Sequence, residues 1–191
     1  MLLTKKTRQT YLAALGFYKG KIDGKEGALT KAAYRALQNK YYTRAKDKDG
    51  VYGKNTDILL RNAYKVYCYC SNFKLEEFKC ECGGKYCTGY PVELNTQLLK
   101  NLQTIRNTYG ATTITSGLRC KLYNSSLKGS SSTSRHMSGK AIDFVNAHTQ
   151  TLSNRKKVMS FIKKLTKHNY TYCNDNGSAP NMGNAIHFDV K

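Results

Sequence analysis

Tryptophan is absent from this chain, proline occurs only twice, and acidic residues are scarce, with 12 against 32 basic residues in 191 positions. No glutamate follows Glu93. No run of about 18 apolar residues occurs, so we predict no insertion into a membrane. The N-terminal residues lack the basic-then-apolar order of a secretory signal, and we therefore expect a soluble chain made in the cytosol. The length allows one ordinary domain or two small ones.

The formal net charge is +20 at pH 7, and residues 1–65 and 66–191 contribute equally to it. A field of this size attracts polyanions and speeds association with them. Nucleic acid and the anionic polymers of a bacterial cell wall both qualify as partners, and a charge excess that only keeps the chain soluble is the alternative. Because the lysines are scattered and no nucleic-acid-binding motif is present, we expect no nucleic acid partner.

Cysteine is more frequent than expected for a cytosolic product. Seven are present, of which five crowd together and two lie elsewhere: Cys68, Cys70, Cys80, Cys82 and Cys87, then Cys120 and Cys173. An odd number cannot be fully paired within one chain. The crowded group could hold a structural zinc, although the two-residue gaps of a zinc ribbon are missing. Reduced or partly oxidised cysteines that only pack are the other interpretation.

A short motif occurs twice in the first third of the chain. DGxxGxxT runs from Asp23 to Thr30 and recurs 26 residues later, from Asp49 to Thr56. The pattern predicts a turn whose glycines supply positive φ, followed by a threonine that caps a helix. Apolar residues at helical spacing follow both copies, and a further helix is expected from about residue 4 to residue 15, ending at Gly16. Residues 1–66 are therefore predicted to form a small three-helix domain.

The rest of the chain predicts an α+β domain with a central antiparallel sheet over residues 72–191, after a linker over residues 67–71. An apolar stripe predicts a helix that begins near Leu98 and ends near Gly110. Strands are expected at residues 112–115, 140–145 and 185–190, with a second helix around residues 158–165. Side chains alternate along a strand, so His187 and Asp189 should share one face of the last one.

Two histidines and one aspartate are candidate metal ligands: His136, Asp143 and His187. Asp143 lies in an apolar strand, where a carboxylate needs a partner, and either a metal or a lysine would serve. Catalytic zinc takes three protein ligands drawn from imidazole and carboxylate and leaves a fourth position open. The Ser-rich segment 125–134, just before His136, is expected to form a loop over such a site.

These residues stand in a recognisable order. The pattern SxHxxGxAxD is complete, an SGxR segment precedes it and an HxD strand follows it, so that the pattern residues are Ser116, Gly117, Arg119, Ser134, His136, Gly139, Ala141, Asp143, His187 and Asp189. In this respect residues 72–191 resemble the zinc D-alanyl-D-alanine metallopeptidase family, which includes the VanY-type carboxypeptidases, the phage L-alanyl-D-glutamate endopeptidases and the hedgehog fold.

The resemblance implies Zn²⁺ as cofactor, with His136, Asp143 and His187 as its ligands. It also implies that Arg119 is the catalytic and substrate-binding cation, which holds a substrate carboxylate or the developing oxyanion. Ser134 would lie on the substrate-binding side, with its hydroxyl orienting a ligand, because hydrogen bonds behind the ligands fix their geometry.

One position departs from the family pattern. Many relatives have an acidic general base three residues before the last histidine, where this chain has Asn184. Asparagine cannot accept the proton. We expect Asp189 to be the catalytic base because it shares a strand face with His187. Alternatively, Asp189 only supports His187, and proton transfer falls to Asp175, in the loop over residues 174–183, or to substrate and water.

Residues 1–66 resemble the bacterial peptidoglycan-binding domain, through an LG-aromatic segment at residues 15–17 and an IDG segment at residues 22–24. The resemblance implies a wall-targeting module in which tyrosines stack on sugars, the candidates being Tyr18, Tyr41, Tyr42 and Tyr52. A helical unit that merely docks on its neighbour is the alternative.

Together the two resemblances imply a monomeric, endolysin-like peptidoglycan hydrolase from a bacteriophage, a bacteriolytic zinc metallopeptidase whose partners are peptidoglycan and the anionic wall polymers. It would be made in the host cytoplasm without a signal peptide and would reach the wall through a holin pore. The expected reaction is cleavage between L-Ala and D-Glu of the stem peptide. The alternatives are a D-Ala-D-Ala carboxypeptidase and a non-catalytic, zinc-containing wall-binding protein.

Overall fold

In the computed structural model, which describes residues 1–191, both DGxxGxxT copies lead into a helix. The first three helices are α1 (Lys5–Ala14), α2 (Ala28–Tyr41) and α3 (Lys54–Tyr69), which confirms the helices expected in this part. Gly24 and Gly50 have φ of +76° and +74°, so the first glycine of each copy does supply the left-handed turn.

The threonines of the repeat do not cap the helices. The N-cap residues are Gly27 and Gly53, both in extended conformation, and Thr30 and Thr56 lie inside the first turn with almost no exposure. The prediction was wrong because a threonine that follows a glycine N-cap by three residues points into the core rather than along the helix axis.

A buried glutamine closes each copy of the repeat instead. The amide nitrogen of Gln38 contacts Asp49 Oδ1 at 3.1 Å and Thr56 Oγ1 at 3.0 Å, and its oxygen accepts a hydrogen bond of 2.7 Å from the Gly50 amide. Gln9 makes the corresponding contacts in the first copy. These bonds satisfy polar groups that would otherwise be unpaired in the core.

The tyrosines proposed to stack on sugars are part of the core. Tyr18, Tyr41 and Tyr42 are each at most 8% exposed. The ring of Tyr52 is covered by the guanidinium of Arg8, which lies 3.8 Å from the ring centroid. None of the four presents a free aromatic face, because this small helical unit uses tyrosine to fill its interior.

Residues 67–69, expected in a linker, continue α3. The segment before α4 (Thr96–Tyr109) is bound to this helix, since Asn62 donates to Val92 O at 2.9 Å and accepts from Leu94 N at 2.7 Å. Core residues from both predicted domains belong to a single cluster of 30 buried side chains. The helical unit and the rest of the chain thus share one core.

The sheet has the strand order β1-β2-β4-β3, with every neighbouring pair antiparallel. The strands are β1 (Thr112–Ser116), β2 (Ala141–Asn146), β3 (His168–Cys173) and β4 (Ile186–Val190). The α+β class and three of these strands were predicted, but β3 was not, because its polar sequence HNYTYC lacks an alternating apolar face. The final strand of the chain lies inside the sheet, between β2 and β3.

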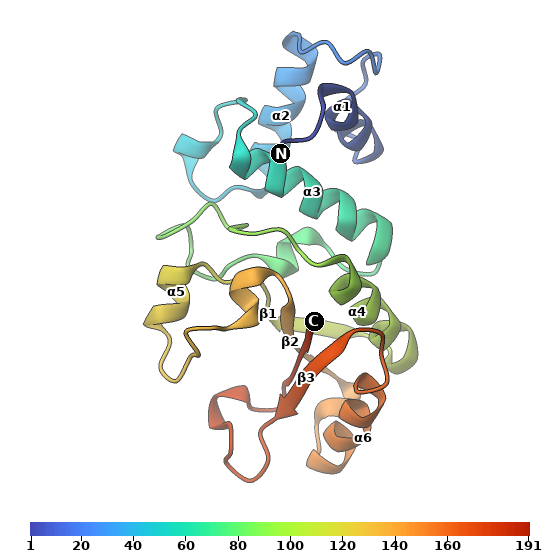
Figure 1. Cartoon of the computed structure of the whole chain (residues 1–191), viewed down its shortest axis with the longest axis vertical. Coiled ribbons are helices and arrows are strands. Elements are labelled where there is room, and N and C mark those ends of the chain that lie inside the picture. The colour runs from blue at the N-terminus through green and yellow to red at the C-terminus, as the bar shows by residue number, and fades with distance from the viewer.

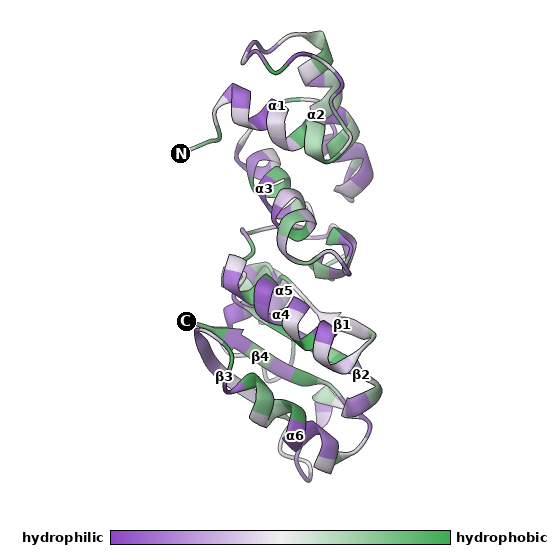
Figure 2. Ribbon diagram, turned by 90° about the vertical axis from the view of Figure 1, so that its right-hand side faces the viewer, coloured by the Kyte–Doolittle hydropathy of each residue, from purple (hydrophilic) through white to green (hydrophobic).

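Two further helices, α5 (Lys121–Ser126) and α6 (Leu152–Ile162), complete the set of six. Single 3₁₀ turns occupy Ala45–Asp47, Leu75–Phe78, Arg135–Ser138, Ala147–Thr149 and Pro180–Met182. The molecule is elongated, with α1 and α2 at one end, α6 at the other, and α3 and α4 between the first two helices and the sheet (Figure 1, Figure 2). No helix is both long enough and apolar enough to cross a membrane.

The two faces of the sheet differ in chemistry. Ile142 and Phe144 of β2, with Ile186 and Phe188 of β4, are buried in the core cluster together with apolar residues of α4 and α6. The intervening residues of the same strands point the opposite way. That second face carries the polar residues of β2 and β4, and they are buried too.

Candidate metal centre and active site

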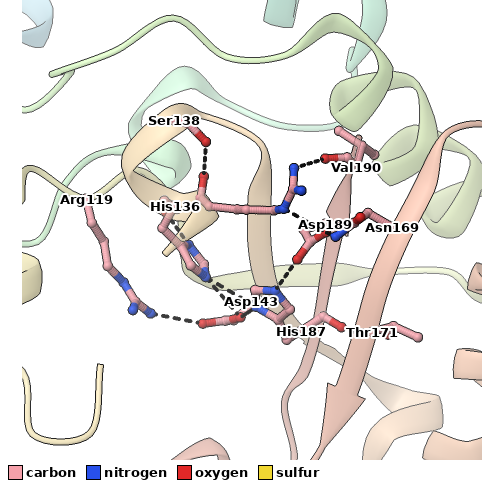
Figure 3. A network of polar contacts seen from close by, with 11 residues as sticks. Arg119, His136, Ser138, Asp143, Asn169, Thr171, His187, Asp189 and Val190 are labelled. Carbon is pink, nitrogen blue, oxygen red and sulfur yellow. Dashed lines mark hydrogen bonds and ion pairs between the residues drawn. The ribbon is translucent and has the colours of Figure 1, made fainter. Parts of the chain in front are cut away.

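Strand pairing brings two of the predicted ligands together. Asp143 of β2 lies directly opposite His187 of β4 in the antiparallel register, on the polar face. His136 comes from the 3₁₀ turn Arg135–Ser138, which leads into β2. Figure 3 shows the three side chains converging from these separate elements.

The ligand atoms are close and shielded from water. His136 Nε2 lies 3.3 Å from both Asp143 Oδ1 and His187 Nδ1, and His187 Nδ1 lies 2.7 Å from Asp143 Oδ1. The three residues are 2%, 5% and 6% exposed, in the order 136, 143 and 187. Ligand atoms of a tetrahedral zinc with bonds of about 2.0–2.2 Å lie about 3.3–3.6 Å apart. Two of the separations fit this, and the shortest is a hydrogen-bond distance, as expected where a proton is shared.

Hydrogen bonds behind the ligands decide which ring nitrogens face the centre. His136 Nδ1 lies 2.7 Å from the carbonyl of Gly117, and His187 Nε2 lies 3.2 Å from Asp189 Oδ2. The Gly117 carbonyl can only accept, so His136 donates its Nδ1 proton outward and turns Nε2 inward, while His187 has a carboxylate at each ring nitrogen. Two imidazole nitrogens and a carboxylate oxygen that converge on one point form a donor set of the kind that zinc takes, and the residues therefore fit a metal.

The turn that carries His136 depends on Gly139, whose φ is +68°. A Cβ at this position would lie 2.1 Å from the carbonyl oxygen of Glu93, and the Gly139 carbonyl accepts a hydrogen bond from Asn95 N. The glycine of the SxHxxGxAxD pattern is thus required both for its conformation and for this close approach of backbone.

The electrostatic surroundings of Asp143 and His187 favour their charged forms. Burial by itself would raise the pKa of Asp143, but hydrogen bonds from His136 and His187 hold it below its ordinary value. Burial would lower the pKa of His187, whereas its bonds to Asp143 and Asp189 raise it. These shifts favour a negative charge on Asp143 and a positive charge on His187 in the metal-free chain.

Arg119 lies beside this centre as expected. Its Nη2 donates to Asp143 Oδ2 at 3.2 Å, so the two carboxylate oxygens of Asp143 face different partners. Nε and Nη2 also donate to the hydroxyl of Ser116, at 3.1 and 2.9 Å. Ser116 fixes the guanidinium, and Arg119 is part of the cavity lining.

Asp189 occupies the side of His187 away from the centre. The two nitrogens of an imidazole point in divergent directions, and the carboxylate contacts Nε2 while Nδ1 faces the other ligands. Asp189 also accepts from Asn169 at 2.6 Å and lies 3.6 Å from Arg135 Nε. This placement, behind the ring of His187, fits the second role expected for Asp189, which is to support His187.

The other candidates for proton transfer lie elsewhere. Asp175 is outside the cavity lining and forms an ion pair of 3.0 Å with Lys156. Asn184, at the position of the expected acid, is held by Arg155 Nη1 and Gln150 and does not line the cavity. Neither residue is brought to the three ligands.

A cavity of about 1040 Å³ opens in front of the centre and is lined by Arg119 and all three ligands. The Ser-rich segment forms much of its wall, as predicted, and Ser134 lies in that wall. The group that orients His136 is the Gly117 carbonyl, whereas Ser134 makes no side-chain bond to a ligand.

Two residues of the cavity lining were missed from the sequence. Tyr172 of β3 stacks on His187 with ring centroids 4.7 Å apart, and burial raises its pKa, so its hydroxyl stays protonated. Glu81 lies in the lining without an ion-pair partner and accepts a hydrogen bond from Tyr123. Tyr172 could have been found only by recognising β3, and Glu81 has no sequence signal beyond its position between two cysteines.

A family model described as Peptidase M15 matches residues 71–179, more than half of the chain. The chain belongs to the peptidase M15 family. No curated protein matches it. Membership in the M15 family makes the chain a metallopeptidase, and the metal in this family is usually zinc. The matched residues include His136 and Asp143 but end before His187, which the fold of this M15 peptidase brings to the other two.

Proposed function

We propose that the chain is a zinc-dependent peptidoglycan hydrolase that cleaves a peptide bond in the stem peptide, between L-Ala and D-Glu, and that it acts as a phage endolysin. The observation that carries the proposal is the convergence of His136, Asp143 and His187, with one nitrogen of each imidazole directed inward and Arg119 on the cavity wall. M15 membership supports the peptidase chemistry.

Zn²⁺ held by these three residues would polarise the scissile carbonyl and lower the pKa of a water molecule. Gly117 and Asp189 keep the two histidines in the tautomers that such binding needs. Arg119 neutralises the second oxygen of Asp143 and presents its other donors to a substrate carboxylate or to the oxyanion that develops during hydrolysis.

The size of the cavity favours an endopeptidase over a D-Ala-D-Ala carboxypeptidase. Its volume of about 1040 Å³ is at the upper end of ligand pockets, which run from about 300 to 1,000 Å³. A terminal dipeptide needs only part of that space. Beyond the candidate ligands, the wall offers both anionic and cationic side chains, among them Glu81 and Arg119, which suit a peptide that carries both amines and carboxylates.

Residues 1–66 are proposed to hold the protein on the wall. Since the four candidate tyrosines are unavailable for stacking, the support for this role is the net charge of this part, with 15 basic against 5 acidic residues, which attracts anionic wall polymers.

The test is hydrolysis of purified peptidoglycan, followed by mass spectrometry of the released peptides. The zinc-loaded chain should release new amino termini, and His136→Ala should reduce their release by at least about 10³-fold because one metal ligand is lost. Sedimentation of that variant with the wall should be unchanged. Unchanged release by His136→Ala would refute the metallopeptidase mechanism. Release of free D-alanine as the only small product would identify a carboxypeptidase instead.

A further inference from the structure

Four cysteine sulfurs gather at a second place, beside the active-site cavity. Their Sγ atoms, from Cys80, Cys82, Cys87 and Cys120, all lie within 4.8 Å of one another. Three of these residues are buried and Cys87 is partly buried. The fold thus brings Cys120, which is distant in the sequence, next to three of the five cysteines that crowd together between residues 68 and 87.

The arrangement suits a metal better than a disulfide. The Cys82 and Cys87 sulfurs are 3.5 Å apart, whereas a disulfide bond is about 2.05 Å long. Four sulfurs around a zinc with bonds of about 2.3 Å lie about 3.8 Å from one another. The sulfur–sulfur distances in the cluster, 3.5 Å for Cys82 and Cys87 and at most 4.8 Å for any pair, are compatible with that separation.

The backbone around the sulfurs supports thiolate ligands. The amide of Cys120 donates to Cys80 Sγ at 3.3 Å, and the amide of Gly89 donates to Cys87 Sγ at 3.4 Å. Amide donors stabilise negative charge on sulfur. Gly83, Gly84 and Gly89 have positive φ, which lets the chain between residues 80 and 89 fold tightly around one point.

Packing alone does not account for this cluster. Cys80, Cys82 and Cys120 form a small group of their own, separate from the 30-residue core. No leucine, isoleucine, valine or phenylalanine packs against them, since their neighbours are Tyr86, Cys87 and Tyr123. Four thiolates around a divalent cation carry a net negative charge, and Arg44 and Lys121 line the shallow pocket beside Cys87 and Cys120.

We propose that Cys80, Cys82, Cys87 and Cys120 bind a structural Zn²⁺ that is separate from the catalytic centre. Each thiol gives up its proton to solvent when the metal binds. The bound ion ties residues 80–89 to residue 120. Because Glu81 lies between two of the ligands and Arg119 precedes the fourth, the ion fixes both side chains on the cavity wall.

The experiment combines metal analysis with zinc X-ray absorption on the full chain, purified in reductant and loaded with zinc. The unsubstituted protein should hold about two zinc ions, with a sulfur shell near 2.3 Å and a nitrogen and oxygen shell near 2.0–2.2 Å. In the double variant Cys82→Ser/Cys87→Ser the content should fall by about one ion and the sulfur shell should vanish. In His136→Ala/His187→Ala the sulfur shell should remain.

Cys68→Ser is the matched control, because Cys68 is exposed and lies outside the cluster, and it should keep both shells. If the double cysteine variant does not fold, the spectra of the unsubstituted protein and of the double histidine variant still decide. Absence of a sulfur shell from both, at full zinc loading, would overturn the proposal and leave the catalytic centre unaffected.

Discussion

The carboxylate of Asp189 lies 3.2 Å from Nε2 of His187, the ring nitrogen that faces away from Asp143 and His136. Asp189 can thereby accept the proton that His187 would carry on Nε2 when Nδ1 binds a metal. Asn169 and Arg135 hold the carboxylate in turn. We propose from this relationship that Asp189 positions His187 and is not the base.

We therefore expect Asp189→Asn to weaken zinc binding by about 10–100-fold, because the tautomer of His187 is no longer fixed. Turnover should recover largely when zinc is added in excess. The control is Asp175→Asn, which removes an acid outside the cavity and should leave zinc affinity and turnover unchanged. Zinc affinity is measured by competition with a chelating dye. Complete loss of turnover in Asp189→Asn at saturating zinc would restore Asp189 as the base.

Gly139→Ala should destabilise the chain severely, by more than about 3 kcal/mol, because the new Cβ meets the Glu93 carbonyl at a positive φ. Gly129 has a similar φ of +76° but nothing within 4 Å of its Cβ position. Gly129→Ala should cost only about 1–2 kcal/mol, the conformational part of the penalty. Urea unfolding of both variants measures the difference. Equal destabilisation would mean that the close approach to Glu93 is unimportant.

The stability of the metal-free chain should fall on both the acid and the alkaline side of the pH range. Hydrogen bonds to its neighbours raise the pKa of His187 above 6.5, so its contribution is complete below that value and is lost as pH rises through the raised pKa. The pKa of Asp143 is lowered below 3.8, so its contribution is present above that value and is lost as pH falls through the lowered pKa. Stability should be greatest between the two ordinary values.

Zinc affinity should change in the opposite direction on the alkaline side, since a proton on His187 competes with the metal. Urea unfolding of chelator-treated protein across this pH range, with zinc titrations at the same values, checks both trends. His187→Gln is the control and should remove the alkaline loss of stability. Zinc affinity that is independent of pH near 6.5 would contradict the assignment of His187 as a ligand.

Wall binding is best tested by charge reversal, because deleting residues 1–66 would expose the core that α3 shares with the rest of the chain. Lys19, Lys21 and Lys25 are exposed on the helical unit. Their combined change to glutamate should weaken sedimentation with purified walls, most clearly below about 0.1 M salt. The control changes Lys163, Lys164 and Lys167, which are exposed near α6, by the same total charge. Equal weakening by both sets would show that the wall attracts the positive charge of the whole chain and that residues 1–66 are not a dedicated binding domain.

Much of the fold could be predicted where apolar periodicity is strong. The helix that ends at Gly110 and the strands around Ile142 and Phe188 follow from alternation or helical spacing, because burial of one face dictates the pattern. Strand β3 escaped prediction because it lies at the sheet edge and is polar. The threonines of the repeat were misassigned because threonine occurs both at helix caps and in cores. Only their hydrogen bonds to the buried glutamines show that these two belong to the core.

By itself the sequence determined which three residues are the candidate metal ligands, since few arrangements of histidine and aspartate satisfy a catalytic zinc and these stand in a complete pattern. Tertiary structure alone decided what surrounds them. The pairing of β2 with β4 places His187 opposite Asp143, ring orientation makes Asp189 a support, and the approach of residues 80–89 to residue 120 assembles four sulfurs. These outcomes depend on contacts between segments far apart in the chain, and no local pattern encodes the direction in which a side chain meets its distant neighbour.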